Sequence, residues 1–440
     1  MRLVEIALLG ALFAFYIAAF YPGAIPPDAL WMFHMIRGVS PVSNWHPPFI
    51  TLLWNALDRV FHHPGPLYVV QTLLIFHAVA LAARELAAGW RRIAVELLIL
   101  TWPAVVGQVT ALWKDSWFLA FLLYGTAGVL RHRRSHRSRD LVLALAGAAA
   151  AALTRPNGIF AALPLVVAVA ASHAGARARA WRARAARASL LVVGWIGAVA
   201  AANAVITRSY VEVLYEPWEL TLLHDMVAIS IAHGRVELPP HLTRPPPTLA
   251  ELEALYQPET ADPLIFQQPG KYCFPFPLVP REHRFRVVAA WARAVAASPS
   301  VYLRHRAGFF RALVGLGPRA ALAPYVWGIT PNRFGWEFRP RGPTTWALSR
   351  LASVSTTPVF RAWIYVAALL LAAAGALLAR RLRAVGVVAA SALGTAVTNF
   401  FVLPTWDFRY MLWPVVAALL VIAGTAAALL RRDVPPGGAT

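Results

Sequence analysis

Acidic and basic residues that could carry chemistry sit where long hydrophobic segments of this 440-residue chain begin or end. Asp28, in IPPDALW, could act as a general base, or could cap the start of a helix after Pro26 and Pro27. Lys114, in ALWKDSWF, and Arg409, in TWDFRYMLWP, could hold an anionic oxygen such as that of a phosphate. Together they predict one shared site with one or two carboxylates and several cations.

Further candidates share these segment ends, and each also has a plainer structural interpretation. They are His46, Asp115, Arg155, Asp407 and Tyr410. Arg155 lies in LTRPNGI, whose Pro-Asn-Gly part suits a tight turn by itself. Asp407 could simply neutralise the arginine two residues later, and His46 could be a polar interfacial residue. Because ionisable groups cost about 2.5–3.5 kcal/mol at a membrane helix centre, their gathering at one face is the stronger signal.

The composition indicates that these residues belong to a membrane protein. Hydrophobic residues make up 59% of the chain and charged residues 14%, against roughly a quarter charged in a soluble domain. This excludes a disordered protein, a collagen, a coiled coil and an ordinary cytosolic enzyme. The apolar residues fall in blocks of about twenty, the length that crosses a hydrocarbon core of about 30 Å.

These blocks predict an all-α polytopic membrane protein with about ten transmembrane helices. They lie at residues 3–21, 66–85, 93–112, 115–130, 140–154, 158–173, 189–207, 359–379, 384–402 and 409–430. The basic clusters that fix the orientation are Arg2; Arg84, Arg91 and Arg92; Arg131, Arg133, Arg134, Arg137 and Arg139; Arg177, Arg179, Arg182, Arg184 and Arg187; Arg380, Arg381 and Arg383; and Arg431 and Arg432. One arrangement puts all of them on the same side, with both termini in the cytoplasm. We expect the first span to be retained, since no small-residue cleavage site follows it.

The net charge of +21 arises from these loops, so it indicates contact with an anionic lipid leaflet and not with nucleic acid. The chain has a single cysteine, Cys273, which can form no intrachain disulfide and cannot build a thiolate metal cluster on its own.

The spans divide the chain into four parts. These are an N-terminal membrane module (1–207) that includes the first outer loop (22–65), a large extracytoplasmic segment (208–358), C-terminal membrane helices (359–430) and a cytoplasmic tail (431–440). In the first outer loop, 29–37 and 47–61 predict two interfacial helices, because the longer one rises only about 22 Å and has one apolar face. In the large segment, 239–280 is proline-rich and loop-like, whereas 281–314 predicts helices. Arginines beside aromatic residues there favour helices lying on the membrane surface; they are Arg293, Arg304, Arg306 and Arg311.

The order of these motifs resembles the integral membrane glycosyltransferases of the GT-C superfamily, which include lipid A aminoarabinose transferases and protein O-mannosyltransferases. The shared features are an acid in the first outer loop, the stretch GVSPVSNWHPPF with two interfacial helices, the KD turn, the RPNG turn and the DFRYxxxP entry to the last helix. The resemblance covers 1–207 and 359–430; the segment 208–358 matches no pattern of the family.

The resemblance implies transfer of a sugar from a polyprenyl-phosphate donor to a lipid, glycan or protein acceptor at the outer face of a bacterial plasma membrane, with inversion at the sugar carbon. It implies that Asp28 is the general base and that Lys114, Arg155 and Arg409 hold the lipid phosphate. His46, Asp115, Asp407 and Tyr410 would support them. Only one acid stands in the first-loop motif where other members show two, so we expect no obligatory metal or other cofactor.

Two other functions compete with this one. A transporter or flippase for a lipid-linked or anionic substrate predicts charges near the membrane midplane and even loops on both faces. An O-antigen-ligase-like transferase would also have a large outer loop with paired arginines. The charges at outer helix ends and the one-sided loop favour the glycosyltransferase.

Overall fold

The structure is a computed structural model that describes residues 1–176, 180–239, 242, 246–266, 274, 283–317 and 323–430. Within these ranges it is built from helices, with only isolated bridges between extended residues. Five residues named above lie outside the described ranges, as does the predicted tail 431–440. They are Arg177, Arg179, Cys273, Arg431 and Arg432.

Helices cover most of every predicted span, and both predicted interfacial helices are present. The N-terminal part contains α1 (Arg2–Phe20), α2 (Pro27–Ile36), α3 (Pro48–Phe61), α4 (Pro64–Leu86), α5 (Trp90–Thr101), α6 (Pro103–Val109), α7 (Lys114–Ser135), α8 (Ser138–Thr154), α9 (Gly158–Gly175) and α10 (Trp181–Tyr210). The outer segment, by which we mean the described residues of 208–358, contains α11 (Glu219–His233), α12 (Leu249–Leu255), α13 (Asp262–Ile265), α14 (Arg284–Ala297), α15 (Pro299–Leu313) and α16 (Gly342–Val354). The C-terminal part contains η2 (Pro358–Phe360), α17 (Ala362–Leu378), η3 (Arg380–Leu382), α18 (Arg383–Val402), η4 (Phe408–Met411) and α19 (Leu412–Leu430).

Fewer helices qualify as membrane spans by length and hydropathy than the ten predicted. Among the described residues six do, and a seventh is added if the bent pair α5 and α6 counts as one span. The predicted uninterrupted span 93–112 is therefore wrong: the chain bends by 58° there, because Trp102 is extended and Pro103 starts a new helix. Helices α8 and α17 are 17 residues long, and α7 begins and ends with charged side chains.

Small residues bring the helices of the bundle close together. A Cβ on Gly128 of α7 would lie 2.3 Å from the backbone nitrogen of Ala144 on α8, and one on Gly147 would lie 2.5 Å from that of Gly125. Such close approach through glycine and alanine is typical of helix packing in lipid. The antiparallel pair α7–α8 thus places the end of α8 beside the start of α7.

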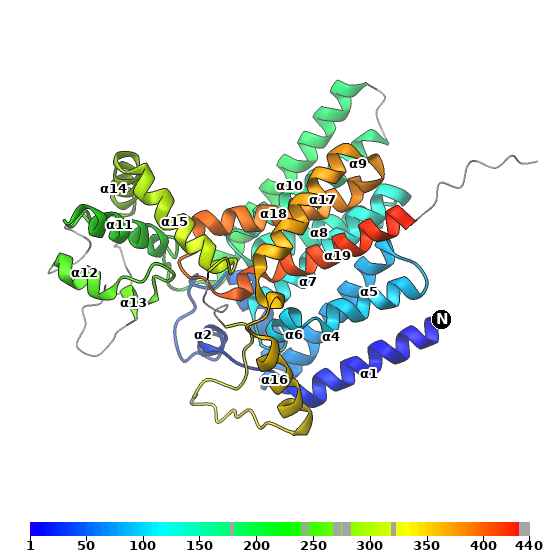
Figure 1. The fold of residues 1–440 in the computed structure, drawn as a ribbon, viewed down its shortest axis with the longest axis horizontal. Helices are drawn as coiled ribbons and strands as arrows, with labels where there is room; N and C mark the ends of the chain where they lie inside the picture. Colours follow the sequence, from blue (N-terminus) through cyan, green and yellow to red (C-terminus); the bar gives the residue numbers. More distant parts are fainter. Residues whose placement is uncertain are drawn as a thin grey trace, which may run out of the picture.

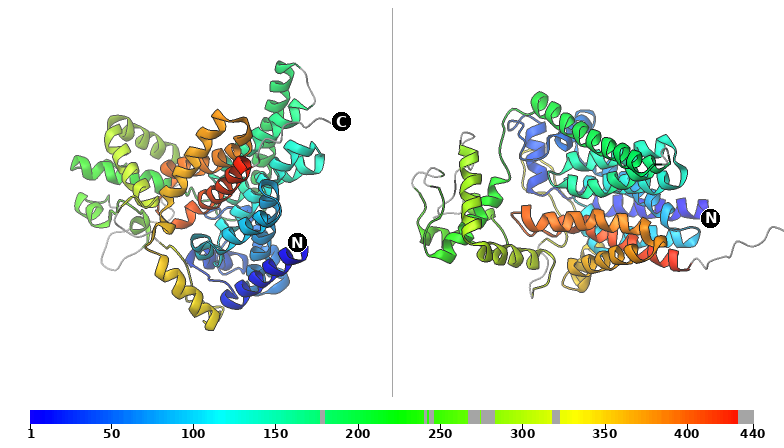
Figure 2. Two further views of the ribbon diagram at one scale, coloured as in Figure 1. Left: turned by 45° about the vertical axis from the view of Figure 1, so that its right-hand side comes forward. Right: turned by 90° about the horizontal axis from the view of Figure 1, so that it is seen from above.

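Helices α11 to α15 of the outer segment project from one end of the bundle, whereas α16 packs against the end of α1 (Figures 1 and 2). The start of α1 and the end of α19 both lie at the opposite end, so these two helix ends share a side. That this side faces the cytoplasm stays a prediction. In the outer segment, α11 to α14 enclose a small hydrophobic core of their own, which includes Met226, Val227, Leu252 and Val287.

The helices predicted at 281–314 are present as α14 and α15, but the prediction that their arginines line a membrane surface is wrong for Arg306. Its side chain is fully buried and pairs with Asp225 of α11. Sequence patterning could not reveal this, because the partner stands on a different helix.

Candidate active site

The first outer loop places Asp28 on an open face of α2. Pro26 and Pro27 start this helix, and its buried face consists of apolar side chains that include Leu30 and Phe33. The Asp28 carboxylate makes no capping hydrogen bond. It lies instead 2.9 Å from Nη2 of Arg409 and 3.7 Å from Nζ of Lys114, while its side chain remains 37% exposed. The capping interpretation of this aspartate is therefore wrong.

Lys114, the first residue of α7, joins Asp28 to the second half of the first outer loop. Its Nζ donates to Nδ1 of His46 at 3.1 Å. Burial, with the adjacent Lys114 ammonium, lowers the pKa of His46 to about 3. His46 is thus a neutral acceptor that orients the lysine.

The next residue of α7, Asp115, forms a buried ion pair with Arg155 at the end of α8. The Arg155 guanidinium also lies over the ring of Tyr410, 4.7 Å from its centroid. This pair connects the α8–α9 turn to the start of the last helix.

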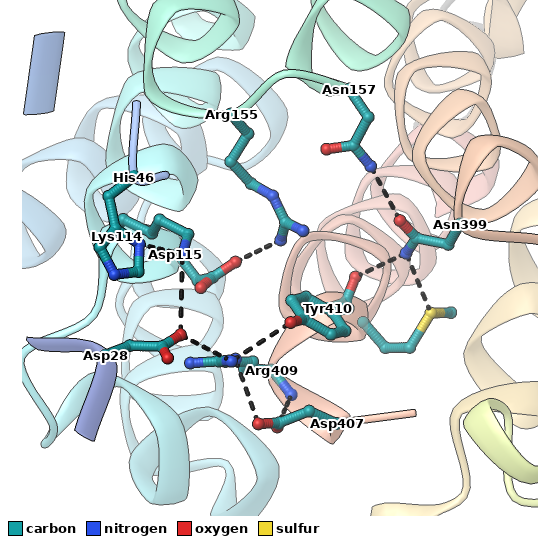
Figure 3. A network of polar contacts seen from close by, with 11 residues as sticks. Asp28, His46, Lys114, Asp115, Arg155, Asn157, Asn399, Asp407, Arg409 and Tyr410 are labelled. Carbon is teal, nitrogen blue, oxygen red and sulfur yellow. Dashed lines mark hydrogen bonds and ion pairs between the residues drawn. The ribbon is translucent and has the colours of Figure 1, made fainter. Parts of the chain in front are cut away.

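Arg409 is the centre of the arrangement (Figure 3). Its Nε lies 3.1 Å from Oδ2 of Asp407, its Nη2 donates to the Tyr410 hydroxyl at 3.2 Å, and its guanidinium lies 4.0 Å from the centroid of the Trp113 ring. The short helix η4 presents it, since Asp407 caps that helix by accepting from the Arg409 backbone N–H at 3.1 Å. Nη1 of Arg409 is buried without a hydrogen-bond partner among the described residues, so one strong donor is left for an anionic ligand.

Two carboxylates at this site have shifted pKa values in opposite directions. Burial by itself would raise the pKa of Asp28, but Arg409, Lys114 and His46 together hold it well below its ordinary value. Burial raises the pKa of Asp407 to about 6, although Arg409 opposes the shift. Asp28 is therefore ionised over the physiological range, and Asp407 changes charge within it.

The structure thus brings together all the residues predicted for the site, and we call this group the charged cluster. Its members are Asp28, His46, Lys114, Asp115, Arg155, Asp407, Arg409 and Tyr410. They come from the first outer loop, the α7 start, the α8–α9 turn and the α19 entry. Their contacts are observed, whereas their roles in a reaction stay predictions.

Sequence reasoning missed the asparagines that hold the cluster from the membrane side. Asn157 donates to Oδ1 of Asn399 at 2.9 Å, and Asn399 donates to the backbone oxygen of Tyr410 at 2.9 Å. The Asn157 side chain was interpreted only as part of a turn. Asn399 could have been found from its residue type, because a side-chain amide inside the apolar span 384–402 needs a polar partner.

A cavity of about 300 Å³ lies elsewhere, between the last residues of α4, the start of α5 and the last turn of α19. It is lined by Leu86, Ala87, Ala88, Trp90, Arg91 and Ala427, and so belongs to the end of the bundle away from the charged cluster. In the part of the chain that the structure describes, no group of three or more His, Cys, Asp or Glu is placed to hold a metal ion. The expectation that the protein needs no obligatory metal stays a prediction.

No protein-family model and no curated protein matches this chain. A structural comparison finds the crystal structure of ArnT from Cupriavidus metallidurans bound to undecaprenyl phosphate, with 14% sequence identity and a TM-score of 0.34 over 98% of this chain and 78% of that chain. The chain is similar to this structure over almost its whole length.

Proposed function

We propose that this chain is an integral membrane glycosyltransferase of the bacterial plasma membrane, which moves a sugar from a polyprenyl-phosphate donor to an acceptor at the outer face. The observation that carries the proposal is the meeting of an exposed acid with buried cations at one end of an apolar bundle. Asp28 lies within 4 Å of both Arg409 and Lys114, and Nη1 of Arg409 is buried with no partner in the described chain.

The cations fit a lipid phosphate. Arg409 and Lys114 offer charge-assisted donors to its oxygens, in surroundings where burial strengthens them. Arg155 is committed to Asp115, so its part in phosphate binding is indirect: it fixes the ring of Tyr410 next to Arg409. The apolar helices around the cluster would receive the polyprenyl chain.

The acid fits the other half of the reaction. Asp28 accepts the proton of an acceptor hydroxyl, whose oxygen attacks the sugar C1 as the bond from C1 to the phosphate oxygen breaks. The polyprenyl phosphate leaves with the bonding electrons, and its charge is held by Arg409 and Lys114. A single displacement of this kind inverts the configuration at C1.

The same contacts link donor binding to the strength of the base. Without a donor, the cations keep the pKa of Asp28 low, and such a carboxylate is a weak base. A bound phosphate would neutralise Arg409 and Lys114, and so would raise the pKa of Asp28 at the moment when an acceptor must be deprotonated.

Reconstituted protein and labelled donors test this proposal. The wild-type chain in lipid nanodiscs is incubated with undecaprenyl-phosphate-linked pentoses and hexoses, together with membrane lipids as acceptors. We expect one donor to be consumed, with free undecaprenyl phosphate and an inverted glycoside as products. If all donors stay intact, or if vesicles containing the protein move a donor across the bilayer without cleaving it, the proposal is wrong and transport becomes the better interpretation.

A further inference from the structure

The outer segment contains a buried ion pair that no part of the proposed reaction uses. Nε of Arg306 on α15 lies 2.7 Å from Oδ1 of Asp225 on α11, and both side chains are at most 1% exposed. Nε1 of Trp291 on α14 donates to the other carboxylate oxygen at 2.9 Å. A buried pair is a costly way to stabilise a fold, because both ions lose their hydration. Its geometry therefore needs a further explanation.

Arg306 is the only cation in direct contact with Asp225 among the described residues. Burial lowers the pKa of the neighbouring His305 to about 2 and that of His224 to about 4, so both rings are neutral. Asp225 therefore fixes the guanidinium through its Nε, and the N–H groups of Nη1 and Nη2 can donate to other acceptors.

Those N–H groups reach the end of α18. Arg306 Nη1 donates to the backbone oxygen of Leu403 at 2.8 Å, and Nη2 donates to that of Thr221 at 3.3 Å. The Thr221 hydroxyl in turn donates to the backbone oxygen of Val402 at 2.9 Å. Arg306 thus connects the core of the outer segment to the residues that follow a membrane helix.

The two residues after Leu403 are held by the outer segment as well. The backbone N–H of Ala261 donates to the oxygen of Pro404 at 2.8 Å, and Thr260 forms an antiparallel bridge with Thr405. The backbone of four consecutive residues, 402–405, is therefore in contact with the outer segment. Asp407 and Arg409 follow immediately, before α19 begins.

We propose that Arg306 and Asp225 are positioning residues, which fix the 402–405 linker so that Arg409 is aimed at Asp28 and at the lipid phosphate. This inference rests on the proposed function for the identity of the ligand, but not for the positioning itself. It gives the outer segment a part in the site, because that segment sets where the phosphate-binding arginine lies.

Hydrogen exchange measures the positioning without any substrate. Arg306→Lys keeps a positive charge near Asp225, but its single nitrogen replaces the three separate nitrogens with which Arg306 contacts Asp225, Leu403 and Thr221. Arg306→Met removes the charge. The matched control is Arg284→Met, which breaks the partly exposed pair with Glu216 in the same segment. We expect amide exchange in peptides covering 403–411 to become at least about tenfold faster in both Arg306 variants and to stay unchanged in the control. Unchanged exchange at 403–411, with faster exchange only in α11 and α15, would overturn the inference.

A double-mutant cycle tests the connection to Arg409. Binding of undecaprenyl phosphate is measured for Arg306→Lys, for Arg409→Met and for both together. We expect Arg306→Lys to weaken binding about tenfold alone and to have no further effect once Arg409 is gone. If the losses of binding free energy in the two single variants add up in the double variant, Arg306 acts independently of Arg409 and the inference is refuted. If the wild-type chain binds no undecaprenyl phosphate, the proposed function fails, while the exchange experiment still decides the positioning.

Discussion

The two ends of the helix bundle both carry ion pairs, but they differ in how far the carboxylates of Glu5 and Asp28 are exposed. At the end where α1 begins and α4 stops, which we call the inner end, Glu5 is 2% exposed and its partners Arg84 and Arg92 are 46% and 18% exposed. In the charged cluster Arg409 is 7% exposed and Lys114 15%, whereas Asp28 is 37% exposed. The inner end thus hides its acid Glu5, whereas the charged cluster leaves one acid, Asp28, more exposed than the cations that it faces, beside the less exposed acids Asp115 and Asp407.

This difference shows what each end is suited to bind. Arginines that reach outward from buried acids can contact lipid headgroups while they hold α1, α4 and α5 together. Under the proposed function, cations that are buried behind a partly exposed acid would instead bind an anion that enters from one side.

The strongest test of this contrast is Asp28→Asn. Loss of a general base is expected to lower turnover by about 10²- to 10⁴-fold. Undecaprenyl phosphate binding should be retained or become tighter, since a carboxylate that competes for Arg409 and Lys114 is removed. Product formation and lipid binding are measured on the same preparation.

The matched control for Asp28→Asn is Asp58→Asn, at an acid of the same outer loop that pairs with Arg37. This variant should keep its turnover at temperatures below its unfolding. Full turnover in Asp28→Asn would show that Asp28 is not the base.

Arg409→Met should have the next largest effect. A charge-assisted hydrogen bond is worth about 1.5–3 kcal/mol, so the affinity for undecaprenyl phosphate should fall by roughly 10- to 100-fold. Arg409→Lys should recover only part of it, because an ammonium cannot replace the planar guanidinium that lies over Trp113. Equal affinity of all three proteins, measured by competition with labelled lipid, would remove Arg409 from the phosphate site.

A smaller effect is expected from pH, through Asp407. Its pKa is raised to about 6, so below that pH it is neutral and no longer competes with a ligand for Arg409. Affinity for a sugar-bearing phosphodiester donor, whose own charge is constant in this range, should therefore rise several-fold as the pH falls from about 7.5 to about 5. Asp407→Asn should bind the donor tightly at both pH values. If this variant keeps the pH dependence of the wild-type protein, another group titrates.

The smallest effect is expected at the inner end. In Arg84→Met, Glu5 keeps Arg92, and loss of a partly exposed pair costs about 0–1 kcal/mol. The melting temperature should change little, and undecaprenyl phosphate affinity should not change at all. A large loss of affinity would erase the distinction between the two ends.

Most of the helices could be predicted from the sequence, because length, hydropathy and basic loops are local properties. The meeting of the charged residues could be predicted because they all lie where hydrophobic segments on one side of the membrane begin or end. The bend at Trp102 could not, since the apolar run continues through it and only Pro103 marks the break. The burial of Arg306 was missed for a different reason. Its partner Asp225 belongs to another helix, and no periodicity reports a contact between helices that are distant in the chain.

One consequence follows from the scattered origin of the charged cluster. Its acid comes from the first outer loop, and its central arginine comes from the entry to the last helix. During synthesis, the acid therefore enters the membrane long before the arginine with which it pairs. A partly inserted polypeptide thus lacks the pair between Asp28 and Arg409, and the charged cluster can assemble only after α19 has joined its neighbours in the bilayer.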